Sequence, residues 1–538
     1  MAEEYLAIDF GTTNSLVYIY RNGMVEYVPH YNKQGTSLFP SFVEYKGNSV
    51  ITGYNAQSDF GLPNKYVVGS IKRLLGLSYE EYDELEDKAI FGCDVVKGDD
   101  GNPVVVVDDK GRKVSPVLIA AELFKTLKVA SDAYGGRNYQ KAYVTVPANY
   151  RDHQCKAIKK AAQLAGLTVE KLITEPTAAA LSWCIDNINK LHVGERMIVY
   201  DFGGGTFDVS LVEYTAMKSF IVVDVDGNPR LGGNDVDVSL MKHLIKNYKQ
   251  RTNRTKGEDV INKNKRKRVE FQKECEGLKT LTTNNTVYCD SETEYLKKNQ
   301  RMNAPVPFNI IDKGLEDDIY CYPKDVNDAS RSLIDQTINI TLRLIQRNGM
   351  STNDVSYFFV VGGSSNLHLI KNKIHDQFKR SQFPKVDLEK AVAEGALKMV
   401  LNDLLPPDEQ VKIGEKIVFS FGLQSDYNSV ILLLKKGEII PTESKPIKFK
   451  NSDGFEDCFR SSIYQWSGKP STTGSMIVPI TECTQVGCLE FTNPFPQEKG
   501  KQKLAISFSL SVGGTLEVKC KDIKRDVLLT KKTFEALH

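Results

Sequence analysis

The sequence predicts an α/β domain of two similar halves over roughly the first 400 residues, followed by an all-β sandwich. Strand-length apolar runs alternate with amphipathic helical stretches in the first part, which is typical of helices flanking sheets. After Pro406 and Pro407 the helical periodicity disappears and short strands remain. Within the first part, Ala7–Asn14 and Tyr200–Asp208 repeat one pattern, which indicates duplicated halves.

The elements of the first part are assigned from their apolar spacing. The predicted strands include Tyr5–Asp9, Ala142–Val146, Met197–Asp201 and Tyr357–Val361. The predicted helices include Pro116–Ala133, His153–Ala165, Val236–Tyr248 and Ala329–Asn348. Asn262–Lys279 is a further, strongly charged helix that carries a basic run at 263–268. We interpret that run as a solvated helix face, with a nuclear signal or an RNA contact as the alternatives.

A linker and a β-domain complete the predicted organisation. Leu401–Asp408 is a short apolar segment closed by two prolines, and its leucines are expected to dock somewhere. The predicted domains are therefore residues 1–400, a linker at 401–412, and a β-sandwich at 413–538, which ends in a possible helical turn at Thr533–Leu537. The predicted strands of the sandwich are Ile417–Leu423, Val430–Leu434, Pro446–Phe449, Met476–Ile480, Leu504–Ser511 and Thr515–Lys519.

Composition excludes several classes of protein. The 538 residues carry a net charge of +2, which argues against binding of nucleic acid or membranes through bulk charge. No apolar run reaches the roughly 18 residues that span a bilayer, and the acidic start does not resemble a targeting peptide. The 10 cysteines are scattered without a Cys-x-x-Cys pair, so we expect reduced thiols and a cytoplasmic location.

The two repeated segments predict a polyphosphate site. In each, an apolar strand runs into an aspartate, Asp9 or Asp201, and then into a turn of glycine and threonine. Glycine lets backbone N–H groups approach an anion closely, and threonine adds a hydroxyl donor. The aspartates suit the Mg²⁺ that accompanies a nucleoside triphosphate. One such loop could be an ordinary turn, but two at matching strand ends favour a shared ligand.

Other motifs extend this interpretation. Leu231–Asp235 and Val360–Ser365 are further glycine turns, and no Walker-type phosphate loop occurs. Glu175 precedes a helix that begins with Pro176, where a carboxylate could orient water or simply favour the helix terminus. Lys72 could stabilise charge on a transferring phosphoryl group, although its immediate sequence does not single it out.

In combination these segments resemble the 70-kDa heat-shock chaperones of the actin/hexokinase-like ATPase superfamily. The resemblance covers roughly 400 residues in the family's order and spacing, and less closely the β-domain. The segments that carry it are Ile8–Ser15, Lys72–Gly76, Val144–Ala148, Glu175–Ala180, Asp201–Asp208, Leu231–Gly233, Val361–Ser364 and Glu389–Ala393.

The resemblance implies a role for each matching residue. The catalytic residues would be Lys72, Glu175, Asp201 and Thr206, with Mg²⁺ near Asp9 and Asp201 and K⁺ near Asp208. ATP or ADP would contact Thr12, Thr13, Asn14, Gly203, Gly204, Gly205, Thr206, Gly232, Gly233, Glu276, Lys279, Thr283, Gly362, Gly363, Ser364 and Asn366.

Several positions depart from the family pattern. Thr280 and Asn366 stand where the family carries basic residues around adenine, and Asn14 replaces a common aromatic residue. Losing stacked cations would cost about 0.5–2 kcal/mol of nucleotide affinity. In the β-domain, Asp426 stands at an apolar position of the arch that encloses peptide, and the family's helical lid does not follow.

The implied function is an ATP-hydrolysing chaperone that binds unfolded or nascent polypeptides and works with a J-domain co-chaperone and a nucleotide-exchange factor. The alternative is a lidless interaction protein, ribosome-associated or assisting other chaperones, in which nucleotide acts mainly as a conformational switch. A sugar or glycerol kinase of the same superfamily fits poorly, because the linker and β-domain have no place in one. No membrane or sequence-specific nucleic-acid partner is expected.

Overall fold

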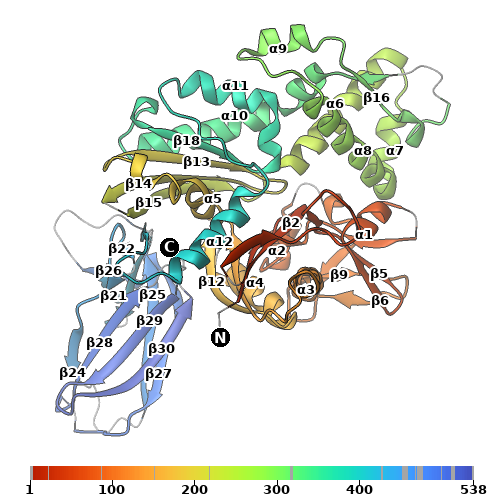
Figure 1. The fold of residues 1–538 in the computed structure, drawn as a ribbon. Helices are drawn as coiled ribbons and strands as arrows, with labels where there is room; N and C mark the ends of the chain where they lie inside the picture. Colours follow the sequence, from red (N-terminus) through yellow and green to blue (C-terminus); the bar gives the residue numbers. More distant parts are fainter. Residues whose placement is uncertain are drawn as a thin grey trace. The chain divides into compact units, whose positions relative to one another are not determined.

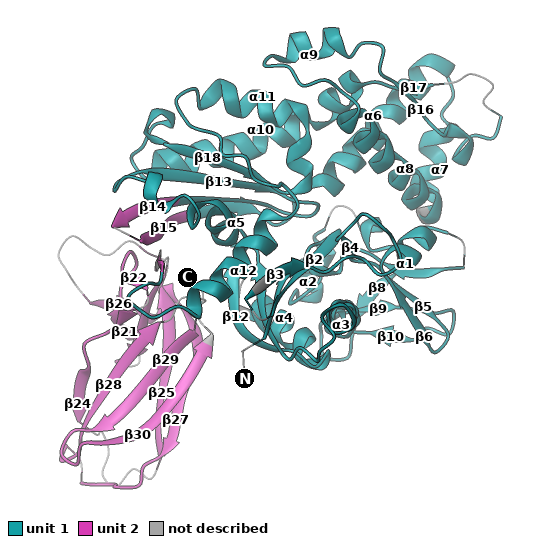
Figure 2. Cartoon of the chain, in the orientation of Figure 1, with its two compact units in different colours: residues 1–211, 225–410 teal, residues 212–224, 411–538 magenta. Residues whose placement is uncertain are grey.

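The computed structural model describes residues 4–535 except 22, 63, 86–87, 149, 151, 217, 315–318, 418, 426–427, 441, 451–457, 467, 469–475, 499 and 511–514. The chain divides into two compact units, coloured separately in Figure 2. Unit 1 is residues 1–211 and 225–410, and unit 2 is residues 212–224 and 411–538. We find no candidate for a membrane-spanning helix within the described residues.

The first half of unit 1 is built on a mixed sheet (Figure 1). Its strands in spatial order are β12 (Thr168–Thr174), β11 (Lys141–Val146), β1 (Tyr5–Asp9), β2 (Asn14–Arg21) and β3 (Met24–Tyr27), with β4 (Phe39–Pro40) paired to β2. β1 pairs in parallel with β11 and in antiparallel with β2. α3 (Pro116–Gly135) and α4 (Asp152–Leu164) pack on the sheet, where Phe124 stacks on Phe10 at a ring-centroid distance of 4.6 Å.

Two small sheets and two short helices are inserted into this half. One sheet has the order β6 (Ser49–Thr52), β5 (Val43–Lys46) and β7 (Tyr66–Val68), and the other β10 (Lys113–Val114), β9 (Pro103–Val106) and β8 (Val95–Lys97). The helices are α1 (Tyr54–Asp59) and α2 (Tyr79–Asp83), and the 3₁₀ turn η1 (Ile71–Arg73) carries two residues of the site described below.

The second half of unit 1 repeats the arrangement of β1, β2 and β11. β13 (Arg196–Phe202) pairs in parallel with β18 (Tyr357–Val361), and β14 (Phe207–Ala216) and β15 (Ser219–Asn228) continue the sheet. The helices of this half are α6 (Gly233–Thr252), α7 (Lys256–Lys263), α8 (Lys265–Asn284), α9 (Glu292–Lys298), α10 (Pro323–Arg347) and α11 (His368–Gln377). β16 (Ala304–Pro305) and β17 (Tyr320–Cys321) form a two-stranded sheet.

Two helices, α5 (Glu175–Cys184) and α12 (Ala391–Asp403), pack closely against each other and against the central strands of unit 1. Their backbones meet at Gly395, where an added Cβ would lie 1.6 Å from the carbonyl oxygen of Ala178. Glu175, the first residue of α5, directly follows Thr174, the last residue of β12.

Unit 2 contains a β-sandwich of two antiparallel sheets. One sheet has the order β26 (Ile477–Pro479), β21 (Ser429–Leu434), β20 (Ser420–Gln424), β25 (Cys458–Trp466) and β27 (Cys483–Thr492). The other contains β23 (Thr442–Glu443), β24 (Ile447–Lys450), β28 (Lys503–Leu510), β29 (Thr515–Asp522) and β30 (Val527–Glu535). Phe421 and Leu489 from one sheet and Phe508 and Val518 from the other share one buried core, which confirms the predicted sandwich.

A second feature of unit 2 is a strand pair outside the sandwich. Residues 212–224, the adjoining ends of β14 and β15, are grouped with this unit. There Ser219–Val222 pair in parallel with Lys412–Glu415 of β19 (Lys412–Lys416), which in turn pairs with β22 (Ile439–Ile440).

The predicted strands and helices of the first part are confirmed in type, because each overlaps an observed element of the same type. Two local predictions were wrong. Asn262–Lys279 is not one helix, since the Asn264 side chain accepts from the Lys267 N–H at 3.1 Å and caps α8. The helical turn predicted at Thr533–Leu537 was wrong for Thr533–Glu535, which are the end of β30, and residues 536–537 lie outside the described residues.

The segment predicted as the linker is divided between two kinds of structure. Leu401–Asp403 form the last turn of α12, and the units separate after Gln410. Asp403 is held within unit 1 by the Tyr143 hydroxyl at 2.9 Å and the Lys171 ammonium at 3.0 Å. The predicted domain limits themselves stay a prediction.

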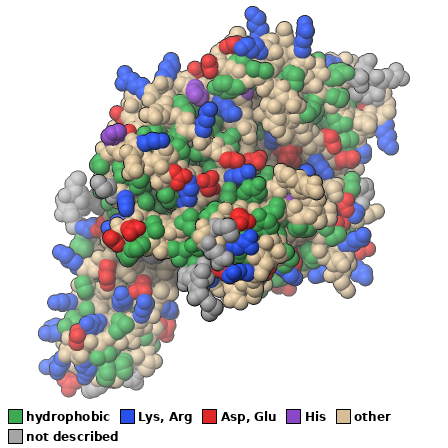
Figure 3. All heavy atoms as spheres, viewed as in Figure 1, with side chains coloured by type: hydrophobic (Ala, Val, Ile, Leu, Met, Phe, Trp, Pro, Cys, Tyr) green, Lys and Arg blue, Asp and Glu red, His purple; other side chains and the backbone are tan. Residues whose placement is uncertain are grey.

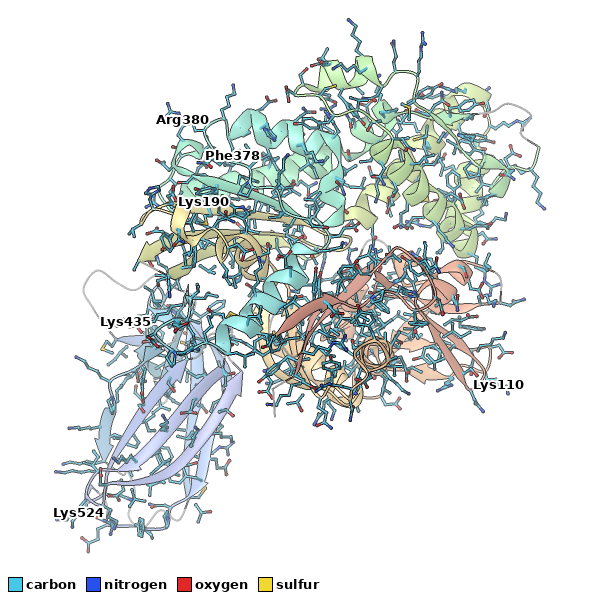
Figure 4. The ribbon with its side chains drawn as sticks, viewed as in Figure 1. Lys110, Lys190, Phe378, Arg380, Lys435 and Lys524 are labelled. Atoms are coloured by element: carbon cyan, nitrogen blue, oxygen red, sulfur yellow. The ribbon has the colours of Figure 1, made fainter. Side chains whose placement is uncertain are left out.

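The surface agrees with the nearly balanced composition. In Figure 3, Lys and Arg side chains are interspersed with Asp and Glu over the visible face. Among the exposed lysines that Figure 4 labels are Lys110 and Lys190 in unit 1 and Lys524 in unit 2. The ten cysteines lie among the described residues and are not joined in disulfides, which agrees with the expected reduced thiols.

Replacing Gly395 with alanine should destabilise the protein by about 3 kcal/mol, because the new methyl group would overlap the Ala178 carbonyl. Gly277→Ala is the matched control: it also lies inside a helix, but nothing lies within 4 Å of an added Cβ. That substitution should stabilise the protein by up to about 1 kcal/mol. Urea denaturation of both variants measures the difference, and equal effects would contradict the packing argument.

Candidate functional site

A polar cleft of about 330 Å³ lies in unit 1, where the turns after β1, β13 and β18 meet. It is lined by every residue predicted to be catalytic and by every predicted nucleotide contact except Gly232. Asp9 also lines it, whereas Asp208 lies buried outside the lining with 1% of its surface exposed. The structure thus brings together residues that are far apart in the sequence.

The first turn of the cleft, between β1 and β2, is held by two serines. The Ser41 hydroxyl donates to the Gly11 carbonyl at 2.9 Å, and its backbone N–H donates to the Thr13 carbonyl at 2.8 Å. Ser15 lies 3.0 Å from Ser41 and accepts from the Gly11 N–H at 3.2 Å. This network shapes the turn so that Thr12, Thr13 and Asn14 line the cleft.

The second turn, Gly203–Gly205, packs directly on the first. A Cβ on Gly204 would lie 2.2 Å from the Thr13 hydroxyl, and one on Gly205 would lie 2.6 Å from the Thr12 side chain. The carbonyls of Gly203 and Gly204 accept from the N–H groups of Gly233 and Asn234 at 2.9 and 2.8 Å. Glycine is required here because the turns leave no room for side chains.

Arg73 is a residue of this site that sequence reasoning missed. Its guanidinium donates to the Gly205 carbonyl and, at 2.7 Å, to Asp235. Asp235 in turn accepts from the Gly232 N–H at 2.7 Å at the start of α6. Gly232 therefore supports the Gly203–Gly205 turn through Asp235 and Arg73 and does not line the cleft itself. The sequence carried one signal for this arrangement, the Gly-Gly-x-Asp pattern at the start of a helix, because an acidic residue at that position is typical of helix capping.

At the inner end of the cleft, Lys72 and Glu175 form a buried ion pair. The ammonium of Lys72 lies 2.5 Å from the Glu175 carboxylate, with side chains 4% and 9% exposed. The Lys72 carbonyl accepts from the Tyr150 hydroxyl at 3.0 Å, which fixes η1. Burial opposes the charge on Lys72, but the carboxylates of Glu175 and Asp9 outweigh it and raise the lysine pKa. Lys72 is therefore charged at neutral pH.

The sequence comparisons agree with this geometry. The family described as "Hsp70 protein" matches residues 5–530. This chain belongs to the Hsp70 family. Two similar curated proteins, both named "Chaperone protein DnaK", come from Psychrobacter cryohalolentis and Burkholderia cenocepacia. They are 25% and 26% identical to this chain over 521 and 524 residues, which is 96% of this chain and 75% of each relative.

The Hsp70 family consists of ATPases that act as ATP-dependent chaperones, with an actin-like ATPase domain and a β-sandwich domain. The mixed α/β fold of unit 1 and the sandwich of unit 2 are consistent with that plan. The family also uses Mg²⁺ with its nucleotide. The carboxylates of this cleft therefore have to be compared with the ligands that Mg²⁺ prefers.

The carboxylates at the inner end of the cleft suit a hard cation. Burial and the nearby Glu175 charge raise the pKa of Asp9 to about 7, and Thr145 donates to Asp9 at 3.1 Å. Burial, Glu175 and Asp208 raise the pKa of Asp201 well above its usual value. Within the described residues, no three acidic, His or Cys side chains converge as a direct ligand set. The fit is to Mg²⁺, which keeps several waters and binds phosphate oxygens.

The opposite end of the cleft is formed by α8 and the turn after β18. Glu276, Lys279, Thr280 and Thr283 come from α8, and Asn366 faces them from the turn. The Asn366 amide donates to the Gly363 carbonyl at 3.2 Å. Thr280 and Asn366 thus lie at the positions where the resemblance implies adenine contacts, without the positive charge common in the family. Asp426 lies outside the described residues.

A buried histidine follows Leu367, which is part of the cleft lining. His368, the first residue of α11, is 5% exposed and accepts from the Cys289 N–H at 3.1 Å through Nε2. Its ring stacks on Tyr295 at a centroid distance of 3.6 Å. Burial and the nearby Lys371 charge lower the pKa of His368. The imidazole is therefore neutral at pH 7, as its acceptor role requires.

The contribution of His368 to stability should fall as the pH drops below about 6.5, because the unfolded chain then binds a proton at this histidine that the buried imidazole of the folded chain does not bind. His368→Gln offers an acceptor that does not titrate, so it should flatten this slope of melting temperature against pH. His192→Gln is the control, since His192 is 85% exposed. An unchanged slope in His368→Gln would show that this histidine does not cause it.

Proposed function

We propose that this chain is a molecular chaperone that hydrolyses ATP in the unit 1 cleft and couples the nucleotide state to binding of unfolded polypeptide by unit 2. The observation that carries the proposal is the ion pair of Lys72 and Glu175 at the end of a cleft lined by the glycine turns. A chain that only bound nucleotide would not need a lysine desolvated beside three carboxylates.

The residues of the cleft divide the work. Backbone N–H groups of the turns at 11–13 and 203–205 would hold the phosphates, which glycine permits by leaving them uncovered. Lys72 would stabilise charge that develops on the transferred phosphoryl group, and Glu175 keeps its ammonium aimed into the cleft. Thr206 and Glu175 would orient the attacking water. Mg²⁺, held through water by Asp9 and Asp201, would neutralise phosphate charge, and K⁺ beside Asp208 belongs to the same proposal.

The chain path supplies a route for coupling. β14 starts at Phe207, directly after Thr206 of the cleft, and its far end belongs to unit 2. Within unit 2, β15 pairs with β19, the strand that precedes the sandwich. We propose that nucleotide-dependent movement of the 203–206 turn reaches the sandwich through these strands. A J-domain protein and an exchange factor are the proposed partners. The lidless or ribosome-associated alternative finds no support in the described residues.

Lys72→Ala should abolish ATP hydrolysis while nucleotide binding persists, because the lysine acts on the transferring phosphoryl group and the turns bind the rest. Single-turnover hydrolysis and the Kd for ADP measure the two effects separately. Lys97→Ala is the control, since Lys97 forms an exposed pair with Glu80 at 2.6 Å. Equal hydrolysis rates in wild type and Lys72→Ala would remove the proposed mechanism.

The affinity of the full chain for an unfolded peptide should be about tenfold lower with ATP than with ADP, as expected for coupling of about 1.4 kcal/mol. Fluorescence anisotropy of a labelled apolar peptide measures it. In Lys72→Ala the low affinity for peptide should persist in the presence of ATP, because this variant no longer hydrolyses ATP to ADP. Absence of peptide binding in both nucleotide states would favour an interaction protein instead.

A further inference from the structure

A second buried ion pair lies beside the cleft and has no part in the chemistry described above. The Lys279 ammonium on α8 lies 2.7 Å from the Asp237 carboxylate on α6, with side chains 12% and 4% exposed. Lys279 lines the nucleotide cleft, whereas Asp237 lines a small cavity of about 50 Å³ that adjoins the cleft and shares Glu276 with its lining. The Asp237 carboxylate thus pairs with the lysine without lining the cleft itself.

Lys279 also connects three parts of the site. Its ammonium donates to the Gly233 carbonyl at 3.2 Å, at the first residue of α6. A Cβ on Gly233 would lie 3.4 Å from that ammonium and 2.2 Å from the Ser364 hydroxyl. α8, the start of α6 and the turn after β18 therefore meet around this one side chain, and a displaced Lys279 would disturb all three.

We infer that Asp237 is a positioning residue for nucleotide binding, which acts by holding the Lys279 ammonium against the Gly233 carbonyl at the edge of the cleft. This inference rests on the proposed function, because it requires that the cleft binds nucleotide. Asp237 itself does not line the cleft, so its effect passes through Lys279. Its removal should weaken nucleotide binding without slowing hydrolysis at saturation.

The charges around Asp237 explain why its carboxylate depends on Lys279. Glu276 on α8 and Asp235 on α6 both repel the Asp237 carboxylate, and buried Cys275 lies nearby on α8. Asp235 is engaged by Arg73 at 2.7 Å, whereas Asp237 is paired with Lys279 at 2.7 Å. Lys273 lines the same small cavity but donates to the Gln57 carbonyl at 3.0 Å.

These surroundings make the pair sensitive to pH. Burial and the Glu276 charge raise the pKa of Asp237 to about 7, against the opposing effect of Lys279. Above that pH the carboxylate is ionised and holds the lysine. Below it the carboxyl group is protonated, so wild type should come to resemble a variant that lacks the charge.

The test is a double-mutant cycle on the full chain with fluorescent ADP and Mg²⁺ at pH 8. Asp237→Asn and Lys279→Met should each raise the Kd about tenfold, and the double variant should be no worse than either. In Asp237→Asn the value of kcat at saturating ATP should stay unchanged, because Asp237 does not line the cleft. At pH 6 the Kd ratio of Asp237→Asn to wild type should fall towards one.

Asp312→Asn is the matched control. Asp312 is a buried carboxylate of the same half that accepts from Tyr248 at 2.7 Å and from Arg254 at 3.0 Å, away from the cleft. It should lose stability without a change in Kd, which separates general loosening from positioning. If Asp237→Asn fails to fold, Asp237→Leu with Lys279→Met removes both charges and should match Lys279→Met alone.

The outcomes separate the two proposals. Three results would each overturn the positioning role of Asp237 without affecting the proposal of ATP hydrolysis. They are a Kd within twofold of wild type for Asp237→Asn, multiplicative effects on Kd in the double variant, and a tenfold Kd ratio that persists at pH 6. If the wild-type chain binds no nucleotide at all, both the proposed function and this inference are wrong.

Discussion

The structure of the site depends on one buried cation among buried acids. Lys72 neutralises Glu175 at 2.5 Å and opposes the rise in the pKa values of Asp9 and Asp201 that burial causes. Desolvating this many carboxylates without the lysine would be strongly unfavourable. The 3₁₀ turn that carries Lys72 is therefore fixed by its neighbours, including the Tyr150 hydroxyl on its carbonyl. The preorganised charge that catalysis needs is the same charge that keeps the inner cleft assembled.

The outer cleft is organised by close backbone contact instead of charge. Gly204 and Gly205 pass so near Thr13 and Thr12 that no Cβ fits, and the Gly205 carbonyl is held by Arg73. These contacts bring the N–H groups of two turns to one anion site. Because β14 continues from the second turn and reaches unit 2, a local change at the phosphates has a continuous chain path to the sandwich.

Much of this was predictable from local pattern. The strands that carry Asp9 and Asp201 near their ends, and the glycine turns after them, follow from apolar runs and turn residues, which act over a few positions. Arg73, Asp235 and Asp237 were not predictable in the same way, because charged residues near a helix or turn are usually solvated. The division of Asn262–Lys279 was missed because the capping of α8 by Asn264 acts through one side chain.

The sequence by itself determined the alternation of elements, the two aspartate and glycine turns, and membership of the Hsp70 family, which the match over residues 5–530 shows. Only the tertiary structure decided that Lys72 pairs with Glu175, that Arg73 holds Gly205, and that Asp237 pairs with Lys279. The reason is physical: periodicity and turn chemistry are local, whereas a buried ion pair depends on which distant side chains share one desolvated space.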